Sequence, residues 1–354
     1  MLKRPKISKT LRKGILLFLL ILLIEYLVIP ELTGFSQNLY LLKKVKLNYL
    51  ILGIILEGFS LFAYARLEKA VLTEPKLNLF TISRIQLSTL ALSHIVPGGS
   101  AAGTSLGYKL LVDNGVNGSD AGFAVATQGM GSALVLNLLL WLSLLISIPE
   151  HGFNPLYWLA ALAGLILIAS FAVLILLFTT RKDLAERAII WLTNKISFLD
   201  QIQLKNIIEK VSFRLKEFSR DKNLMLRTSG WAGANWVLDA ASLWTFVAAF
   251  GKNEQPINLM VAYGLAYVLS VIPITPGGLG VVEGVLVPFL VGFGTPKGIA
   301  ILGVLSYRLI NFWLPIPLGA IAYLSLKVPG ASKHRKAQEL DRLANTYTHK
   351  KNRG

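Results

Sequence analysis

Long apolar runs alternate with short polar stretches along most of this chain. Runs near the roughly 20 residues that a helix needs to cross a bilayer cover residues 14–30, 47–65, 119–148, 156–179, 229–250 and 297–326. Two further apolar segments, 80–112 and 257–293, are interrupted near their middle. A hydrophobic content of 54% agrees with this pattern. We therefore predict an all-α polytopic membrane protein with about six transmembrane helices.

Both interrupted segments break at the same tripeptide, in "SHIVPGGSAAG" and in "PITPGGLGVVEG". Each segment is too short for two comfortable spans, so we predict two re-entrant helical hairpins. A hairpin tip must reverse the chain within a few residues, which needs a proline stop and the freedom of glycine. Non-helical backbone at membrane depth is tolerated only inside protein or beside a water-filled cavity. The two tips are therefore expected to line one cavity, the alternative being that Pro-Gly-Gly simply ends a helix at a surface loop.

The positions of lysine and arginine set the expected orientation. The chain has 36 of these residues against 19 acidic ones, a formal net charge of +17. Most lie before residue 14, in 66–84, in 181–227 and after residue 326, which all fall on one side if both termini are cytoplasmic. Because cytoplasmic loops carry the basic excess, we predict this orientation in the cell membrane. The net charge is then explained without nucleic-acid binding.

In that orientation the first hairpin enters from the cytoplasmic face and the second from the outer face. Residues 47–148 and 229–326 then have the same order of elements with opposite topology, the inverted repeat of many secondary transporters. We expect residues 1–326 to form a single membrane domain. Within it, 181–227 is an amphipathic linker on the cytoplasmic leaflet, and residues 327–354 form a basic cytoplasmic tail.

Charged side chains within apolar spans are costly unless paired or hydrated, so each is a candidate functional residue. Arg308 lies roughly 16 Å into the last span at 1.5 Å per residue, and Glu283 follows the second tip, so we predict an ion pair between them. Either Arg308 meets an anionic lipid headgroup, or the pair permanently holds the second hairpin to the last span. Glu57 and Asp239 occupy equivalent depths in the two halves. They are candidates for proton or cation coupling, with hydrogen bonding between helices as the alternative.

Other polar residues complete the set of candidates. His94 precedes the first tip and belongs to the residue type that titrates near neutrality; the alternative is a buried, hydrogen-bonded histidine. Glu25 lies near the outer end of the first span and is expected to reach the interface. The remaining candidates for cavity lining or helix contacts are Ser93, Thr104, Gln128, Asn137, Asn235 and Thr275. The chain has no cysteine and only 4 histidines, never spaced as a ligand pair, so no metal site or cofactor is expected.

The motifs "PGGLGVVEG", "LSYRLINFWLPIPLGAIAY" and "PGGSAAG" resemble the flippase-like transmembrane region of lysylphosphatidylglycerol synthases over nearly the whole chain. The resemblance implies movement of a lipid with a modified headgroup between leaflets. It points to substrate-binding residues at Pro276, Gly277, Gly278, Glu283, Tyr307 and Arg308, to which the first tip adds His94, Pro97, Gly98 and Gly99. The full-length synthases carry a soluble aminoacyl-transferase domain after this region, and no such domain follows here, so aminoacyl transfer is not expected.

We therefore expect a flippase-like protein that moves an anionic or modified-headgroup lipid, either a phospholipid or a polyprenyl-phosphate-linked one. Membrane lipids are the expected partners, and transport is favoured over enzymatic activity. Two alternatives stay open. One is a membrane-embedded transferase acting on a lipid-linked sugar. The other is an accessory subunit of a glycosyltransferase or lipid-modifying enzyme in envelope glycan synthesis.

Overall fold

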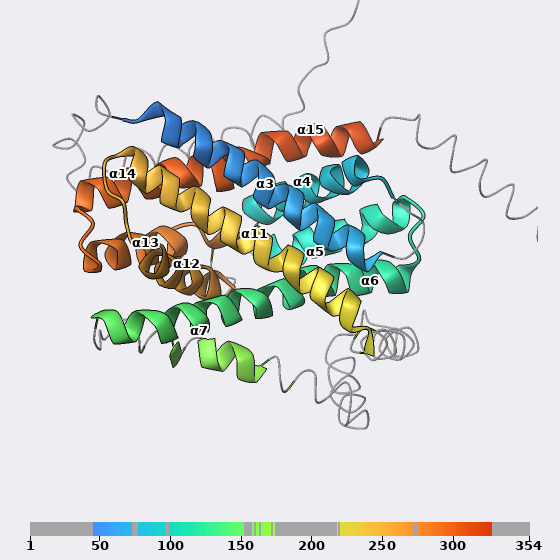
Figure 1. Ribbon diagram of the computed structural model, residues 1–354. Helices are drawn as coiled ribbons and strands as arrows, with labels where there is room; N and C mark the ends of the chain where they lie inside the picture. The colour runs from blue at the N-terminus through green and yellow to red at the C-terminus, as the bar shows by residue number, and fades with distance from the viewer. Residues whose placement is uncertain are drawn as a thin grey trace, which may run out of the picture.

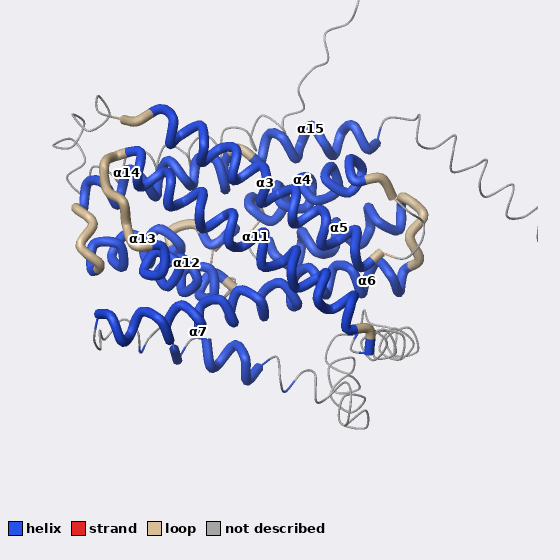
Figure 2. The backbone as a smooth tube through the Cα atoms, in the orientation of Figure 1, coloured by secondary structure: helices blue, strands red, loops and turns tan. Residues whose placement is uncertain are grey.

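The computed structural model describes residues 45–72, 77–96, 99–151, 220–271 and 275–327, together with Phe218 and scattered positions between 158 and 173. In this described part every regular element is a helix, and short loops join the helices (Figure 2). Several predictions lie outside the described residues: the span 14–30 with Glu25, Pro97 and Gly98, most of the span 156–179, most of the 181–227 linker, and the tail after Lys327.

The first half of the predicted repeat contains a helix, a helical hairpin and a long helix. α3 (Leu47–Val71) is followed by the hairpin helices α4 (Leu79–Ile95) and α5 (Gly99–Asp113). α6 (Gly118–Ala126), the π-helical segment η3 (Thr127–Gly131) and α7 (Ser132–His151) follow one another directly. The helical character of 80–112 and 119–148 is thus confirmed. α3 runs beyond the predicted end at residue 65, because the alanine, arginine, leucine, glutamate and lysine of its last turns are strong helix formers.

The second half has the same order of elements. α11 (Lys222–Ala249) precedes the second hairpin, made of α12 (Pro256–Ser270), the short turn η4 (Pro276–Gly278) and α13 (Val281–Gly292). α14 (Lys297–Arg308), the π-helical segment η5 (Leu309–Trp313) and α15 (Pro315–Lys327) form the last long helix. Both long helices therefore contain a π-helical segment.

The start of α11 corrects the predicted boundary near residue 229. Oδ1 of Asp221 accepts a hydrogen bond from the backbone N–H of Leu224 at 2.9 Å and caps the helix there. The end of the predicted 181–227 linker therefore forms the first turns of α11.

α3 and α11, the first helices of the two halves, cross the molecule side by side in opposite directions (Figure 1). The backbone N–H of Lys46 donates to Ala249 at 3.0 Å at one end, and Ser60 and Asn235 exchange hydrogen bonds further along. A Cβ added to Gly53 would lie 2.7 Å from Oγ1 of Thr245, so the two helices can lie this close here only because residue 53 is glycine.

Each hairpin packs against the long helix of the other half (Figure 1). α15 lies on α4, where a Cβ on Gly319 would come 2.1 Å from the carbonyl oxygen of Leu87. α7 lies on α12, where a Cβ on Gly264 would come 3.0 Å from Leu140. This reciprocal exchange, together with the antiparallel α3 and α11, gives the two halves an arrangement that resembles two-fold symmetry.

The turn of the second hairpin has the non-helical backbone that its sequence predicts. Gly277, Gly278 and Gly280 have positive φ angles of 54°, 71° and 79°, which residues with a Cβ rarely adopt. Gly277 also lies against the first hairpin, since an added Cβ would lie 2.8 Å from Cδ2 of His94. The two hairpins thus meet near their tips.

The described surface is rich in large apolar side chains. Ile51, Leu52, Ile55 and Phe59 of α3 are each between 43% and 56% exposed, and α7 shows a similar apolar face. Three helical stretches in the described part are long and apolar enough to cross a membrane: Leu47–Val71, Gly118–Ile148 and Lys297–Lys327. An apolar surface of this extent fits hydrocarbon better than water.

Candidate functional site

A cavity of about 500 Å³ lies among α3, α4, α11 and α12, a size typical of small-molecule sites. It therefore has walls from the first helix of each half and the first helix of each hairpin. Its polar lining comes from Glu57, Ser60, Tyr64, Ser83, Gln86, His94, Ser100, Gln128, Ser132, Asn235, Trp236, Asp239, Tyr267, Ser270 and Asn311.

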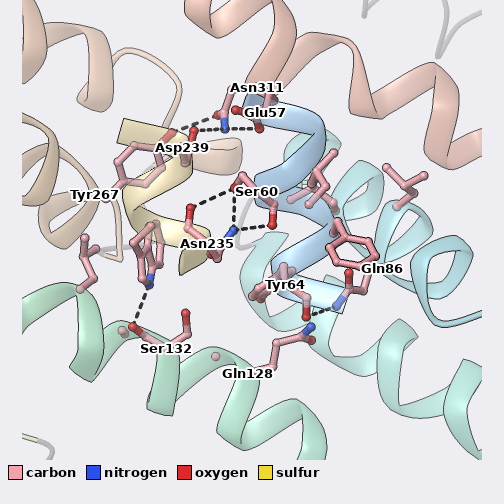
Figure 3. A pocket seen from close by; sticks show the side chains of 18 of the residues that line it. Glu57, Ser60, Tyr64, Gln86, Gln128, Ser132, Asn235, Asp239, Tyr267 and Asn311 are labelled. Carbon is pink, nitrogen blue, oxygen red and sulfur yellow. Dashed lines mark hydrogen bonds between the residues drawn. The ribbon is translucent and has the colours of Figure 1, made fainter. Parts of the chain in front are cut away.

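At one end of the cavity, two carboxylates from different helices share one amide group. Nδ2 of Asn311 donates to Oε1 of Glu57 at 3.1 Å and to Oδ1 of Asp239 at 3.2 Å. The three side chains converge from η5, α3 and α11 (Figure 3). Only 3% of Glu57 and 5% of Asp239 is exposed. The two coupling candidates, which are far apart in the sequence, therefore form a single buried site.

Three tyrosine hydroxyls extend this network. Tyr263 and Tyr307 donate to Oδ2 and Oδ1 of Asp239 at 2.6 and 2.8 Å. Tyr267 is hydrogen-bonded to the hydroxyl of Tyr307 and donates to Oδ1 of Asn311 at 3.0 Å. Because Tyr263 and Tyr267 both lie on α12, the second hairpin is attached directly to the carboxylate site.

The two π-helical segments both contribute to the cavity. η5 carries Asn311, one turn beyond Tyr307, and η3 carries Gln128. A π-helical turn inserts one residue into the helical repeat and changes which side chains share a face, and such turns often occur at functional sites. The distortion recurs in the corresponding long helix of each half.

The other end of the cavity is lined by uncharged amides and hydroxyls (Figure 3). Nε2 of Gln86 donates to the carbonyl of Tyr64 at 2.9 Å, and the indole of Trp236 donates to the carbonyl of Ser132 at 2.9 Å. Asn235 and Ser60 lie between the two ends and bond to each other across α3 and α11. These groups give the cavity many hydrogen-bonding partners with little charge.

The predicted ion pair between Glu283 and Arg308 is confirmed, with Nε of Arg308 donating to Oε1 of Glu283. Oε2 of Glu283 also accepts from the backbone N–H of Gly280 at 2.7 Å, at the start of α13. The guanidinium lies 4.3 Å from the centroid of the Phe312 ring. Arg308 is 1% exposed and does not line the cavity, so this geometry favours the structural interpretation of the pair.

Among the predicted site residues, the cavity brings together His94, Glu57 and Asp239. The imidazole of His94 stacks on Phe312 and its Nδ1 is 2.9 Å from the Phe312 carbonyl oxygen, so it is a hydrogen-bonded, half-buried histidine. Outside the lining lie Tyr307, Gly99, Pro276, Gly277 and Gly278, the last four at or beside the hairpin turns. Among the six further polar candidates, Gln128 and Asn235 line the cavity.

Sequence reasoning missed Asn311, Tyr263, Tyr267 and Glu68. Glu68 is buried near the end of α3 and accepts from Nε2 of Gln128 at 3.4 Å; it lies beyond residue 65, where the predicted span ends. The spacing of Tyr263 and Tyr267 by four residues, on one face of an apolar helix, was the available signal for the tyrosine network.

The charge of the lining is negative. The described residues around the cavity include Glu57 and Asp239 but no lysine or arginine. No group of three or more His, Cys, Asp and Glu side chains close enough to hold a metal ion occurs within the described residues. The site therefore offers carboxylates, amides, hydroxyls and the aromatic surfaces of Trp236 and Tyr267 to a ligand.

The fold and the apolar surface define a helical membrane protein. Residues 14–319 match the family model of the lysylphosphatidylglycerol synthase TM region, and the chain belongs to that family.

Several membrane proteins are similar to this chain. A UPF0104 membrane protein of Methanothermobacter thermautotrophicus is 22% identical over 296 residues, which cover 79% of this chain and 86% of that protein. The UPF0104 membrane protein PH1989 of Pyrococcus horikoshii is 21% identical over 310 residues, covering 82% and 91%. The inner membrane protein YbhN of Escherichia coli is 30% identical over 99 residues, covering 27% and 29%.

Proposed function

We propose that this protein is a flippase-like transporter that moves a lipid between leaflets with the headgroup in the cavity. The observation that carries the proposal is the composition of the walls, since one cavity is bounded by a helix from each hairpin and by α3 and α11. Hairpins from two repeats that meet at a central site are the arrangement that alternating access needs. Rocking of one hairpin against the other would expose the site to each face in turn.

The lining favours a modified headgroup over a simple anionic one. A bare phosphate placed next to Glu57 and Asp239 would be repelled, and the described lining contains no lysine or arginine. A headgroup with amino or hydroxyl groups would instead bond the carboxylates and amides, and Trp236 or Tyr267 would cover its apolar faces. Because a cavity of about 500 Å³ holds a headgroup rather than a whole lipid, the acyl or prenyl chains would stay in the bilayer.

In this proposal Arg308 and Glu283 hold α13 to the last long helix and do not contact the headgroup in the present conformation. The pair fixes the helix that leaves the second tip, while the adjacent Phe312 ring contacts His94 of the first hairpin. Movement of the hairpins would therefore be transmitted through this cluster.

The proposed membrane arrangement is a multi-pass protein of the cell membrane with six spans, two re-entrant hairpins and both termini cytoplasmic. The antiparallel crossing of α3 and α11 supports opposite orientations of the two halves. α4, at 17 residues, is at the lower limit of what the bilayer core requires, and α12, at 15, is below it, which supports hairpins that enter and leave by the same face.

The proposal is tested by reconstituting the purified protein in vesicles that contain tracer lipids with aminoacylated, glycosylated or simple anionic headgroups. The accessible fraction of each headgroup is measured with an impermeant reagent. We expect the protein to make lipids with an amino- or hydroxyl-bearing headgroup exchange faster than they do in protein-free vesicles. The lipid with a simple anionic headgroup is expected to exchange more slowly than these modified lipids. No acceleration for any of the three tracer lipids would overturn the proposed function.

A further inference from the structure

We propose that Glu57 and Asp239 form a proton-binding site, and that a proton exchanged there through the cavity drives lipid movement. This inference rests on the proposed function and deepens it, since it assigns the energy source to a particular pair of side chains.

The geometry of the pair requires a bound cation or proton. Both carboxyl groups are buried and both accept from the single amide nitrogen of Asn311. Two carboxylates held this close in a poorly solvated place repel one another strongly when both are ionised. Within the described structure, Oε2 of Glu57 is buried and makes no hydrogen bond, although a buried carboxylate oxygen normally has a partner. A proton on this oxygen would relieve the repulsion, and the resulting O–H would be a donor in place of an acceptor that has no partner.

The charged and titratable groups packed around Glu57 and Asp239 do not neutralise both carboxylates in place of that proton. α14 contributes Tyr307 and Arg308, and α12 contributes Tyr263 and Tyr267. Arg308 is the cation of this cluster, and its Nε donates to Glu283 of α13. Among these described groups, one guanidinium charge therefore stands against the three carboxylates of Glu57, Asp239 and Glu283, and its printed ion pair is with Glu283. His94 of α4 is bound to the Phe312 carbonyl, and Tyr64 lies further along the cavity.

Proton exchange with water is possible through the cavity, because Glu57, Asp239 and Asn311 all line it. The tyrosine hydroxyls accept as well as donate, so the chain from Asp239 through Tyr307 to Tyr267 can also redistribute a proton. The hairpin movement that exposes the cavity to each face of the membrane in turn would then expose the bound proton and the headgroup to the same face.

Proton binding is coupled to hairpin position through the hydrogen bonds that connect Glu57 and Asp239 to α12. Tyr267 of α12 bonds both Asn311 and Tyr307, so the second hairpin is tied to the carboxylates by hydroxyl groups. Loss of the proton places two negative charges on α3 and α11 at their crossing. The resulting repulsion changes the partners available to Asn311 and Tyr267, and with them the preferred position of α12. The protonated and deprotonated forms thus favour different hairpin positions.

The test measures how a tracer lipid distributes between leaflets when a pH difference is imposed across the vesicle membrane. The membrane potential is clamped and the sodium concentration is equal on both sides. If one proton moves with each lipid, every unit of pH difference produces about tenfold asymmetry at equilibrium, since 1.4 kcal/mol is a factor of ten. We expect this asymmetry in the wild type, its loss on adding a protonophore, and no asymmetry driven by the pH difference for Glu57→Gln and Asp239→Asn.

Glu254→Gln is the matched control. Glu254 is also a carboxylate with 5% exposure, but it lies in the loop before α12, accepts from Thr295 and does not line the cavity. This variant is expected to retain the asymmetry of the wild type.

A second measurement keeps the inference testable if a variant folds poorly. Infrared difference spectra of the wild-type protein between acidic and alkaline buffer are expected to show a protonated carboxyl band that is lost in Glu57→Gln or Asp239→Asn. A spectrum without such a band overturns the inference. Lipid exchange that ignores the pH gradient, or follows a sodium gradient instead, overturns the coupling and leaves the proposed function standing. An absence of exchange for every tracer lipid removes the proposed function itself, and the coupling with it.

Discussion

Gly277 of the second hairpin lies directly against His94 of the first, where an added Cβ would come 2.8 Å from Cδ2 of the imidazole. The contact joins two segments that each precede or contain a Pro-Gly-Gly turn and that belong to different halves of the chain. It also explains a requirement for glycine beyond chain reversal. The backbone of one hairpin must approach a ring of the other, and any side chain would separate them.

Substitution of Gly277 by alanine is expected to lower stability by about 2 kcal/mol or more. The residue has a positive φ of 54°, and its Cβ would lie 2.5 Å from the Phe312 ring. Gly284→Ala is the control, because a Cβ there meets no atom within 4 Å and alanine favours the helix. Thermal unfolding of the detergent-purified proteins measures the difference. Equal melting temperatures for the two variants would contradict the close contact between hairpins.

Removing one member of the Glu283–Arg308 pair is expected to cost about 3–5 kcal/mol, because it leaves a buried charge without its partner. Arg308→Leu should therefore melt far below the wild type. Adding Glu283→Gln to that variant is expected to restore part of the loss, since the glutamine oxygen can still accept from Gly280 without a charge. Strictly additive losses in the double variant would show that the two side chains do not interact.

The opposite orientations of the two halves are tested by cysteine labelling, which is clean because the chain has no native cysteine. Asn117 lies after the first hairpin and Asn253 before the second, and both are exposed. An impermeant maleimide added to intact cells is expected to label Asn253→Cys. Asn117→Cys should react only after the membrane is opened. Labelling of both cysteines from the same side would rule out the inverted arrangement.

The hairpins and the ion pair could be predicted because their signals are local. Each Pro-Gly-Gly interrupts an apolar run, and the depth of Arg308 along one helix left Glu283 as its natural partner. The sequence could not predict, in the same way, whether the ion pair faces the cavity or the protein interior. Whether Arg308 faces a cavity or the protein interior depends on how α13 and α14 pack, which no spacing within either helix specifies.

The carboxylate site was only half predictable. Glu57 and Asp239 were recognisable as buried charges at equivalent depths, but their meeting at Asn311 depends on three helices distant in the sequence. It also depends on η5, because a π-helical turn changes the face of the helix on which Asn311 lies. The pattern of apolar residues does not predict that turn. Close glycine contacts such as Gly53 on Thr245 determine the crossing, and these appear only in the assembled fold.

Filling the cavity tests the proposed headgroup site. Gly58 lines it, and a Cβ there meets no atom within 4 Å, so Gly58→Trp can place an indole in the space meant for a headgroup. Gly230→Trp is the control, at an exposed helical glycine of α11 outside the lining. In the vesicle assay, we expect Gly58→Trp to reduce lipid exchange to the protein-free rate and Gly230→Trp to keep the wild-type rate. Wild-type exchange by a folded Gly58→Trp protein would contradict the proposed headgroup site.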